Sequence, residues 1–451
     1  MAAIEEKWNA VAEMAKNWVN ETGPGISIAV AKGDDEPFFV SAGDIRYNFG
    51  ETPPKAGPDT LWRMYSMTKP ITAMAAIALI EDGRLDLDDP VSKYFPEFAE
   101  MKVLDLSKAD WIAAENDQTH VLRLDGNSGD IVIKVDRQEA TEARKLIAAD
   151  KPITVRHLVT HTAGLGYSLL NFADPFLAVD YFSNGLNPFQ VDGLVELFLR
   201  RSRQKPLIKF AQELAKQPLL AQPGTLWSYS VGLDLLAAVI EVVASKIAKP
   251  GAPYEYETYV QDRLFTPLGI TSATSGYWTV PKSERARLST MYSGTKGRTI
   301  VDRSENSQWL EPPSFPYGGA GLVMSARDYD KFARMLLNLG KFKGVQVLTQ
   351  NGVKLAMSNL LPKGTDTHLL EKMFNMKAGS LGYGAGGSVL LQPDPGAGRG
   401  AGTYGWGGAA GTVFWVDTTK QVRASAMINR FTAVGLLDEP LIEAVYRDLN
   451  H

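Results

Sequence analysis

The sequence predicts an α/β fold, with one mixed domain built from both ends of the chain and a mostly helical domain inserted between them. Two strand-like runs, 25–31 and 38–42, lie near the N-terminus, and strand-like runs return in the Gly-rich stretch 405–429. The middle of the chain shows helical spacing of its apolar residues instead. Because a sheet must bury a face against another layer, we expect the strands from both ends to share one domain.

The composition is that of a globular protein large enough for two or three domains. The chain has 451 residues, of which 45% are hydrophobic and 22% charged. Its net charge is -4 without a Lys/Arg-rich run, which argues against a nucleic-acid partner. The absence of cysteine excludes disulfides, thiolate catalysis and Cys-ligated metals. The predicted α/β domain comprises residues 1–65 and 291–451, and the predicted helical domain comprises residues 66–290.

The N-terminal segment MAAIEEKWNAVAEMAKNWV is predicted to form an amphipathic helix. Its early charges, EEK, do not fit the basic and apolar regions of a signal peptide, so we expect no leader. The runs 25–31 and 38–42 are predicted to form a hairpin. The polar segment Lys32–Pro37 joins them, and Gly33 is available there for a positive φ angle.

Ile71–Asp82, an Ala-rich segment that ends at Gly83, is the first predicted helix of the inserted domain. The longest apolar run, Ile71–Ile80, is far shorter than the roughly 18 residues that a membrane span needs. We therefore expect a soluble cytoplasmic protein. Helical spacing also marks the segments 194–199, 210–215, 233–243, 328–339 and 437–449.

Residues 105–150 are predicted to be an insertion that carries a β-hairpin. HVLRLDG and DIVIKVD alternate in polarity, and Gly126-Asn127-Ser128-Gly129 between them is typical of a hairpin turn. We favour a surface elaboration for this hairpin. A rim over the active site is the alternative.

Ser66-Met67-Thr68-Lys69 is the first candidate for catalytic chemistry. Serine is a poor nucleophile unless a base takes its proton, and residues three apart lie on one face of a helical turn. The motif thus places an amine beside the hydroxyl, and the following apolar helix offers the burial that favours a neutral amine. Pro70 comes next, so the motif forms either the first turn of that helix or a short turn before it.

The Ser-x-x-Lys spacing alone is weak, because the chain contains it twice more. Ser202–Lys205 lies in the charged run RRSRQK, and Ser293–Lys296 lies in a predicted Gly-containing loop. Only Ser66 lies where an aromatic strand-like segment, LWRMY, meets a helix that we predict to be buried. We therefore assign the nucleophile to Ser66.

The segments around Ser66 resemble the serine β-lactamase-like and penicillin-binding-protein-like family. The likeness begins with TLWRMYSMTKPITAMAAIALIEDGRLDLDDPVSKYFPEF. It continues with PITVRHLVTHTAGL, PGTLWSYSVGLDLLAAVIE, YGGAGLVMSARDYDKFARMLL and GWGGAAGTVFWVD, in family order over almost the whole chain. The resemblance implies a β-lactamase/DD-peptidase-like fold, with a mainly antiparallel sheet flanked by helices.

By this resemblance, Ser66 matches the acylated serine and Lys69 matches its paired lysine. Tyr229 matches the tyrosine of the second motif, a proton shuttle near the serine. Taken alone, Tyr229 would be interpreted as a core aromatic, but its place after Pro-Gly-Thr-x-Trp-Ser favours the catalytic role. A tyrosine serves as a base only if cations stabilise its phenolate, and Lys69 is one such cation.

The third motif of the family matches Trp406-Gly407-Gly408. By analogy, the N–H group of Ala409 pairs with that of Ser66 as an oxyanion hole, in which one donor is typically worth about 3–4 kcal/mol. Glycines at this place let a strand edge approach a substrate closely. A glycine-rich bulge in a packed sheet is the alternative for this segment.

Two departures from the family pattern bear on the substrate. Val231 stands where the second motif usually ends in Asn, and the third motif lacks the Lys and Thr of Lys-Thr-Gly. Those polar groups recognise the carboxylate and amide of β-lactams and peptidoglycan stems, whereas Trp406 suits a neutral, apolar acyl or alcohol group. The motif resembles that of the family VIII carboxylesterases and of related acyltransferases. We therefore expect a serine carboxylesterase acting on short-to-medium acyl esters.

Several alternatives to this function stay open. A β-lactamase, a D-amino-peptide hydrolase or an acyltransferase would keep the nucleophile and change the substrate. A catalytically inactive binding or scaffold protein on this fold is an alternative of a different class. No Gly-x-Ser-x-Gly sequence occurs, which argues against an α/β-hydrolase.

His157 and His161 stand four apart, a spacing that can bind zinc, but the glutamate of a metalloprotease is absent between them. His161 is predicted near a helix C-terminus, where a cation is favoured. We expect no metal, no cofactor, no nucleic-acid or membrane partner, and a small-molecule ester as substrate; a homo-oligomer stays open. A loop-rich stretch holds candidates for the acyl pocket, with core packing as an equal alternative: Phe172, Phe176, Tyr181, Phe182 and Phe189.

Overall fold

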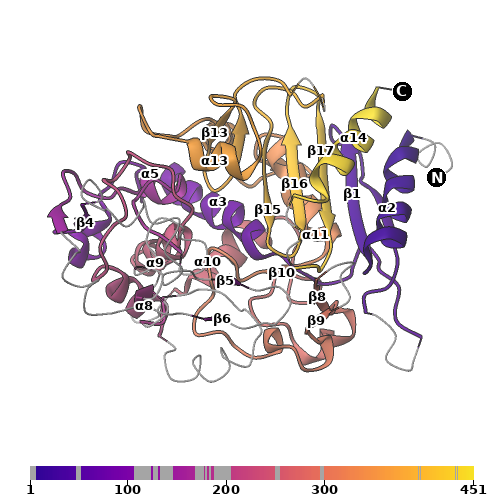
Figure 1. Cartoon of the computed structure of the whole chain (residues 1–451), viewed down its shortest axis with the longest axis horizontal. Helices are drawn as coiled ribbons and strands as arrows, with labels where there is room; N and C mark the ends of the chain where they lie inside the picture. The colour runs from indigo at the N-terminus through magenta and orange to yellow at the C-terminus, as the bar shows by residue number, and fades with distance from the viewer. Residues whose placement is uncertain are drawn as a thin grey trace.

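A seven-stranded antiparallel sheet forms the centre of the computed structural model (Figure 1). Its strand order, β13-β14-β15-β16-β17-β1-β2, sets the N-terminal hairpin beside the last strand of the chain. This sheet confirms the predicted α/β fold. Its strands are β1 (Ile26–Lys32), β2 (Phe38–Ala42), β13 (Leu381–Tyr383), β14 (Ser388–Leu390), β15 (Tyr404–Gly408), β16 (Thr412–Asp417) and β17 (Val422–Met427).

The structure describes most of the chain. The described residues are 7–46, 52–105, 123–124, 131–132, 146–167, 177, 180–181, 184–186, 205–248, 254–294, 299–394, 396, 398–431, 433 and 435–450. The predicted helix 194–199 and the aromatic residues Phe172, Phe176, Phe182 and Phe189 lie outside them.

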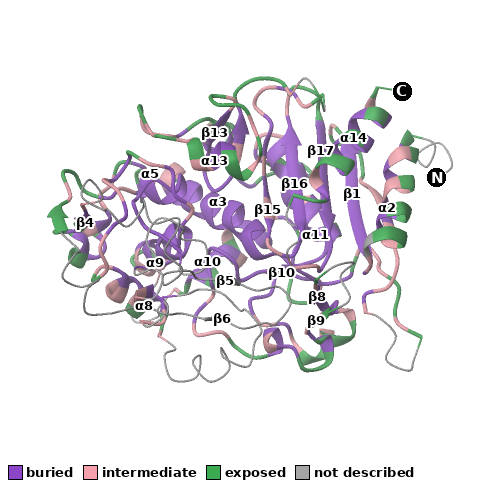
Figure 2. Ribbon diagram, viewed as in Figure 1, coloured by how far each residue is buried: buried purple, intermediate pink, exposed green. Residues whose placement is uncertain are grey.

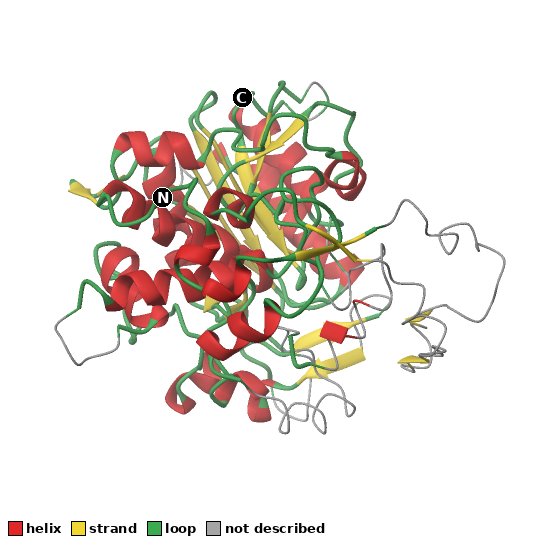
Figure 3. Ribbon diagram, turned by 90° about the vertical axis from the view of Figure 1, so that its left-hand side faces the viewer, coloured by secondary structure: helices red, strands yellow, loops and turns green. Residues whose placement is uncertain are grey.

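Helices cover both faces of the sheet (Figure 3). The terminal helices α2 (Asn9–Thr22) and α14 (Asp438–Leu449) lie together over one face, and α11 (Ala326–Leu337) packs on β1, β16 and β17 from the other. Along β16 the buried side chains alternate between the two faces, as the two-residue period of a strand requires. Asp448 of α14 accepts hydrogen bonds of 3.0 Å from the first N–H groups of α2, those of Ala10 and Val11, which fixes the two chain ends to each other.

The N-terminal hairpin forms as predicted. Strands β1 and β2 pair antiparallel from Ile26↔Ala42 to Val30↔Phe38, and Gly33 in the turn has a φ angle of 54°. Residues of the predicted insertion also pair as expected, since β5 (Arg123–Leu124) lies antiparallel to β6 (Ile131–Val132). The turn between them, 126–129, lies outside the described residues.

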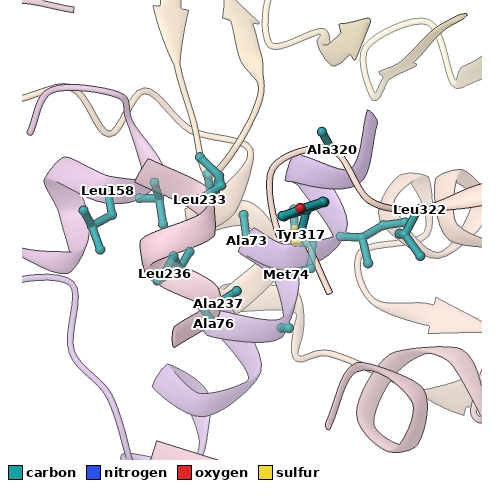
Figure 4. Packing of buried hydrophobic residues seen from close by; sticks show 14 of the residues in the cluster. Ala73, Met74, Ala76, Leu158, Leu233, Leu236, Ala237, Tyr317, Ala320 and Leu322 are labelled. Atoms are coloured by element: carbon teal, nitrogen blue, oxygen red, sulfur yellow. The ribbon is translucent and has the colours of Figure 1, made fainter. Parts of the chain in front are cut away.

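Two buried helices, α3 (Thr68–Glu81) and α9 (Gly232–Ser245), form the centre of the helical region (Figure 2). Figure 4 shows Ala73 and Ala76 of α3 beside Leu236 and Ala237 of α9, where small side chains let the helices approach closely. The helix predicted to begin at Ile71 begins at Thr68 instead. Pro70 is tolerated there because N–H groups in the first turn have no intrahelical acceptor.

Shorter elements surround this core. The other α-helices of the described residues are α5 (Val155–Val159), α8 (Leu207–Leu214), α10 (Tyr256–Val260), α12 (Gln350–Ala356) and α13 (His368–Met373). The other strand pairs are β3 (Trp62–Arg63) with β10 (Val323–Met324), β4 (Lys102–Leu104) with β7 (Leu146–Ala148), β8 (Met291–Ser293) with β9 (Thr299–Asp302), and β11 (Lys341–Phe342) with β12 (Val345–Gln346). In the described part of the chain, no helix is long and apolar enough to cross a membrane. The domain boundaries after residues 65 and 290 stay a prediction.

Helix α5 begins with a capping box that uses a histidine. The Thr154 side chain accepts from the His157 N–H at 3.4 Å, and His157 Nδ1 accepts from the Thr154 N–H at 3.1 Å. Burial, with the positive charges of Lys151 and Arg156, lowers the pKa of His157 to about 4. The neutral imidazole is therefore the form that the folded chain stabilises.

The substitution His157→Gln should reduce the acid sensitivity of the fold. A histidine whose pKa is lower in the folded chain loses its stabilising contribution as the pH falls below its unfolded value of 6.5. Between pH 7.5 and 5.5 this loss is about 1 kcal/mol for His157. Glutamine keeps an acceptor for the Thr154 N–H but does not titrate. Urea unfolding at the two pH values should show that the variant loses less unfolding free energy than the wild type. Equal losses would contradict the lowered pKa of His157.

Candidate active site

Ser66 lies in a buried 3₁₀ turn, η1 (Tyr65–Met67), that runs directly into α3. Tyr65 before it has a φ angle of 43°, which is strained for a residue other than glycine. The Tyr65 ring packs edge-on against Trp309 and Phe431, at centroid distances of 5.7 and 6.0 Å. These contacts hold the turn in the conformation that sets the position of Ser66.

Lys69, in the first turn of α3, is completely buried. Its Nζ atom lies 3.2 Å from Ser66 Oγ, 3.1 Å from the Tyr167 hydroxyl and 2.7 Å from the Gly319 carbonyl oxygen. An ammonium group has three N–H donors, and these three oxygens accept all of them.

Tyr229 completes a compact cluster with Ser66 and Lys69. Its hydroxyl donates to Ser66 Oγ at 2.6 Å, and Lys69 Nζ lies 4.5 Å from the centre of its ring. Trp406 on β15 donates from Nε1 to the Tyr229 hydroxyl at 3.4 Å. The structure thus brings together Ser66, Lys69, Tyr229 and Trp406, four of the residues selected from the sequence.

Aromatic side chains surround Tyr229 and fix its orientation. Its ring contacts those of His161, Tyr167, Trp406 and Trp227, at centroid distances of 4.6, 5.2, 5.7 and 6.1 Å respectively. Such packing restricts the ring to one position, so the phenolic oxygen stays directed at Ser66.

His161 contributes to this packing as a neutral ring. Burial, and then the charge of Lys69, hold the pKa of His161 well below its usual range. Its Nδ1 accepts from the Ser230 N–H at 3.2 Å. The expectation that a cation is favoured at His161 is therefore wrong. The cost of removing a charged imidazole from water outweighs its favourable interaction with the C-terminus of a five-residue helix. Among the described residues, no three His, Cys, Asp or Glu side chains form a metal-binding group.

The glycines of β15 let this strand lie against the serine turn. A Cβ atom on Gly408 would lie 2.2 Å from the Met64 carbonyl oxygen, so only glycine permits the observed contact. Ala409 follows directly after the strand and is half-buried. Gly407 is half-buried as well, and pairs with Val413 of β16.

Three further residues belong to this cluster but were not selected from the sequence. Tyr167 and Gly319 contact Lys69, and Asp234 of α9 accepts from the Gly319 N–H at 2.9 Å. Burial raises the pKa of Asp234 to about 6, although Lys69 acts in the opposite direction. An acidic residue within the apolar helix GLDLLAAVIE was the signal that could have identified Asp234.

The aromatic contacts of Trp406 come from outside the stretch that was expected to line an acyl pocket. Phe374 packs edge-on against Trp406 at 5.3 Å, and Tyr383 does so at 5.2 Å. Tyr181, from the expected stretch, is fully buried, and its hydroxyl accepts from the Gly166 N–H at 3.4 Å. Phe374, at the end of α13, is only half-buried.

The two other Ser-x-x-Lys sequences differ from the first in their surroundings. Ser293 is the last residue of β8 rather than part of a loop, because β8 pairs with β9 up to Ser293↔Thr299. Lys205 donates to the Asn184 carbonyl oxygen. Ser202 and Lys296 lie outside the described residues.

Comparisons with known proteins agree with this architecture. The sequence profile of the family described as Beta-lactamase matches residues 11–446. Esterase EstB from Burkholderia gladioli is 28% identical over 394 residues, which cover 86% of this chain and 81% of that protein. Lovastatin esterase from Penicillium rubens is 28% identical over 410 residues, or 88% of this chain and 87% of that protein.

A solved structure shows the same fold. EstCE1, described as a hydrolase with promiscuous acyltransferase activity, superposes with a TM-score of 0.69 at 23% identity. The match covers 99% of this chain and 100% of that one.

The substitution Gly408→Ala should destabilise the fold where β15 meets the serine turn. The added methyl group would meet the Met64 carbonyl at 2.2 Å and the Thr412 hydroxyl at 2.3 Å, and overpacking of this kind costs about 1–3 kcal/mol. Gly407→Ala is the matched control, because its Cβ would approach only the Thr412 carbonyl, at 3.2 Å. Urea unfolding should rank Gly408→Ala below Gly407→Ala in stability; the reverse order would contradict the tight contact.

Proposed function

The chain belongs to the β-lactamase family, and we propose that it is a serine carboxylesterase that cleaves short-to-medium acyl esters through an acyl-enzyme on Ser66. The observation that carries this proposal is the cluster in which Ser66 Oγ contacts both Tyr229 and Lys69, beside the indole of Trp406. A serine hydroxyl with a basic partner in hydrogen-bond reach is the arrangement of an activated nucleophile.

Acylation begins when the phenolate form of Tyr229, whose oxygen lies 2.6 Å from Ser66 Oγ, takes the proton of the serine hydroxyl. The oxygen then attacks the ester carbonyl, and the N–H groups of Ser66 and Ala409 stabilise the negative charge on the carbonyl oxygen. When the tetrahedral intermediate collapses, the bond between the acyl carbon and the alcohol oxygen breaks. Tyr229 returns its proton to the leaving alcohol.

Deacylation repeats these steps with water. Tyr229 takes a proton from the water, which attacks the acyl carbon, and returns the proton to Ser66 Oγ as the carboxylic acid leaves. The cation of Lys69 lies against the face of the Tyr229 ring and stabilises the phenolate form in both half-reactions.

The preference for neutral esters rests on Trp406. Its side chain is buried, and Phe374 and Tyr383 pack against it, so this side of the site is an apolar surface rather than a cation. A β-lactam or peptide carboxylate would gain no charged partner from these three aromatic side chains. EstB and lovastatin esterase are esterases by description, which supports the same substrate class.

Acyl transfer to an alcohol is the second candidate function. The description of EstCE1 as a hydrolase with acyltransferase activity favours it. Both reactions share the acyl-enzyme and differ only in whether water or an alcohol attacks it. Product analysis in the presence of a short alcohol therefore separates the two.

The wild-type protein should hydrolyse p-nitrophenyl acetate, butyrate and octanoate much faster than nitrocefin. The substitution Ser66→Ala should lower kcat/KM for these esters at least roughly a thousandfold, because it removes the nucleophile. Ser293→Ala, in another Ser-x-x-Lys sequence, is the control and should retain activity. Stopped-flow kinetics and intact mass should detect an acyl adduct in the wild type that Ser66→Ala lacks.

Retained ester cleavage by Ser66→Ala would overturn the assignment of the nucleophile. Nitrocefin turnover that rivals ester turnover would favour a lactam substrate instead. Failure of a fluorophosphonate probe to label the folded wild type would favour a binding protein without catalysis.

A further inference from the structure

We propose that Asp234 is a positioning residue for this reaction: its buried carboxylate acts across the Gly319 peptide group and holds Lys69 as an ammonium ion. Lys69 then keeps the charge that the Tyr229 base of the proposed mechanism requires. The inference rests on the proposed function, because it assigns the roles within the same site. It adds a residue that touches neither Ser66 nor the substrate.

A short chain of hydrogen bonds connects the two charges. Lys69 Nζ donates to the Gly319 carbonyl oxygen at 2.7 Å, and the Gly319 N–H donates to Asp234 Oδ1 at 2.9 Å. Each bond is charge-assisted, because one partner of each carries a full charge. Gly319 therefore has the cation of Lys69 at its carbonyl oxygen and the anion of Asp234 at its N–H group.

The glycines allow the segment 317–321, of which Figure 4 labels Tyr317 and Ala320, to lie against both α3 and α9. A Cβ atom on Gly318 would lie 2.5 Å from the Leu233 carbonyl oxygen, and one on Gly319 would lie 2.6 Å from Asp234 Oδ2. Any side chain at Gly319 would displace the carboxylate. The close approach is thus built into the backbone.

Among the described residues, Lys69 is the cation that acts on Asp234. Lys69 faces it from α3, Tyr167 from the loop after α5, and Tyr256 from α10, and both tyrosines are neutral because burial raises the pKa of each hydroxyl. Asp234 is completely buried, and its Oδ2 atom has no hydrogen-bond partner in the described part of the chain. A buried carboxylate of this kind is costly unless a nearby cation compensates for it, and Lys69 is that cation.

This arrangement supports Tyr229 as the base of the proposed mechanism. The three N–H groups of Lys69 as an ammonium ion have three oxygens within hydrogen-bond distance, those of Ser66, Tyr167 and Gly319. The ammonium ion then stabilises the Tyr229 phenolate, whose ring centre lies 4.5 Å from it. The proton passes from Ser66 Oγ to that phenolate, while Lys69 keeps its charge throughout.

The test compares Asp234→Asn with Glu241→Gln on the same helix. Both carboxylates accept one backbone N–H, that of Gly319 for Asp234 and that of Tyr256 for Glu241, at 3.0 Å in the second case. Both substitutions remove one negative charge and keep an acceptor oxygen. Only the first lies beside Lys69, so Glu241→Gln controls for a purely structural effect.

For Asp234→Asn we expect kcat for p-nitrophenyl butyrate to fall at least about tenfold, with KM within about threefold of wild type. The acid limb of the kcat/KM profile should also move to lower pH, because removal of a negative charge weakens proton binding by the remaining groups. The pKa of Asp234, raised by burial to about 6, places its own titration on that limb. Glu241→Gln should change neither quantity.

An acid limb and kcat equal to those of Glu241→Gln would overturn the inference, as would a change confined to KM. Circular dichroism and thermal unfolding establish that each variant folds. If Asp234→Asn fails to fold, Asp234→Ala removes the charge without adding side-chain N–H donors, and Glu241→Ala is then the matched control, because each alanine also removes the acceptor of one backbone N–H. Absence of ester hydrolysis in the wild type would instead defeat the proposed function, so the two failures are distinguishable.

Discussion

The buried cation of Lys69 is the constraint on which the rest of the site depends. A charged amine without contact to water is destabilising by several kcal/mol unless oxygen atoms surround it. Here the oxygens come from the serine turn, the loop after α5 and the glycine segment before β10. These segments are far apart in sequence, so the cation stabilises the site only when tertiary packing has brought all three together.

The sheet supplies the rigid side of the site. Strand β15 lies in the interior of the seven-stranded sheet, paired on both edges, and helices cover both faces. Its glycines bring it against Met64, next to the strained Tyr65 turn. A nucleophile held between a rigid strand and a buried helix needs little reorganisation when it reacts, which favours catalysis.

The aromatic surroundings of Tyr229 serve packing and chemistry together. Trp406 contacts its hydroxyl and also forms part of the apolar surface with Phe374. The His161 ring packs against the Tyr229 ring as a neutral imidazole. It therefore adds no second cation near Lys69. The aromatic rings around Tyr229 therefore orient this base. They also disfavour a charged group on the substrate, because they offer it no opposite charge.

The sequence by itself determined the local features of this protein. The hairpin turn at Gly33 and the proximity of Ser66 to Lys69 follow from backbone geometry within a few residues, and the order of the family motifs indicated the fold. Only the tertiary structure decided that Asp234 lies behind Gly319, that His161 is neutral, and that Phe374 contacts the site. These properties depend on burial and on distances between segments remote in sequence, and neither residue spacing nor composition specifies them.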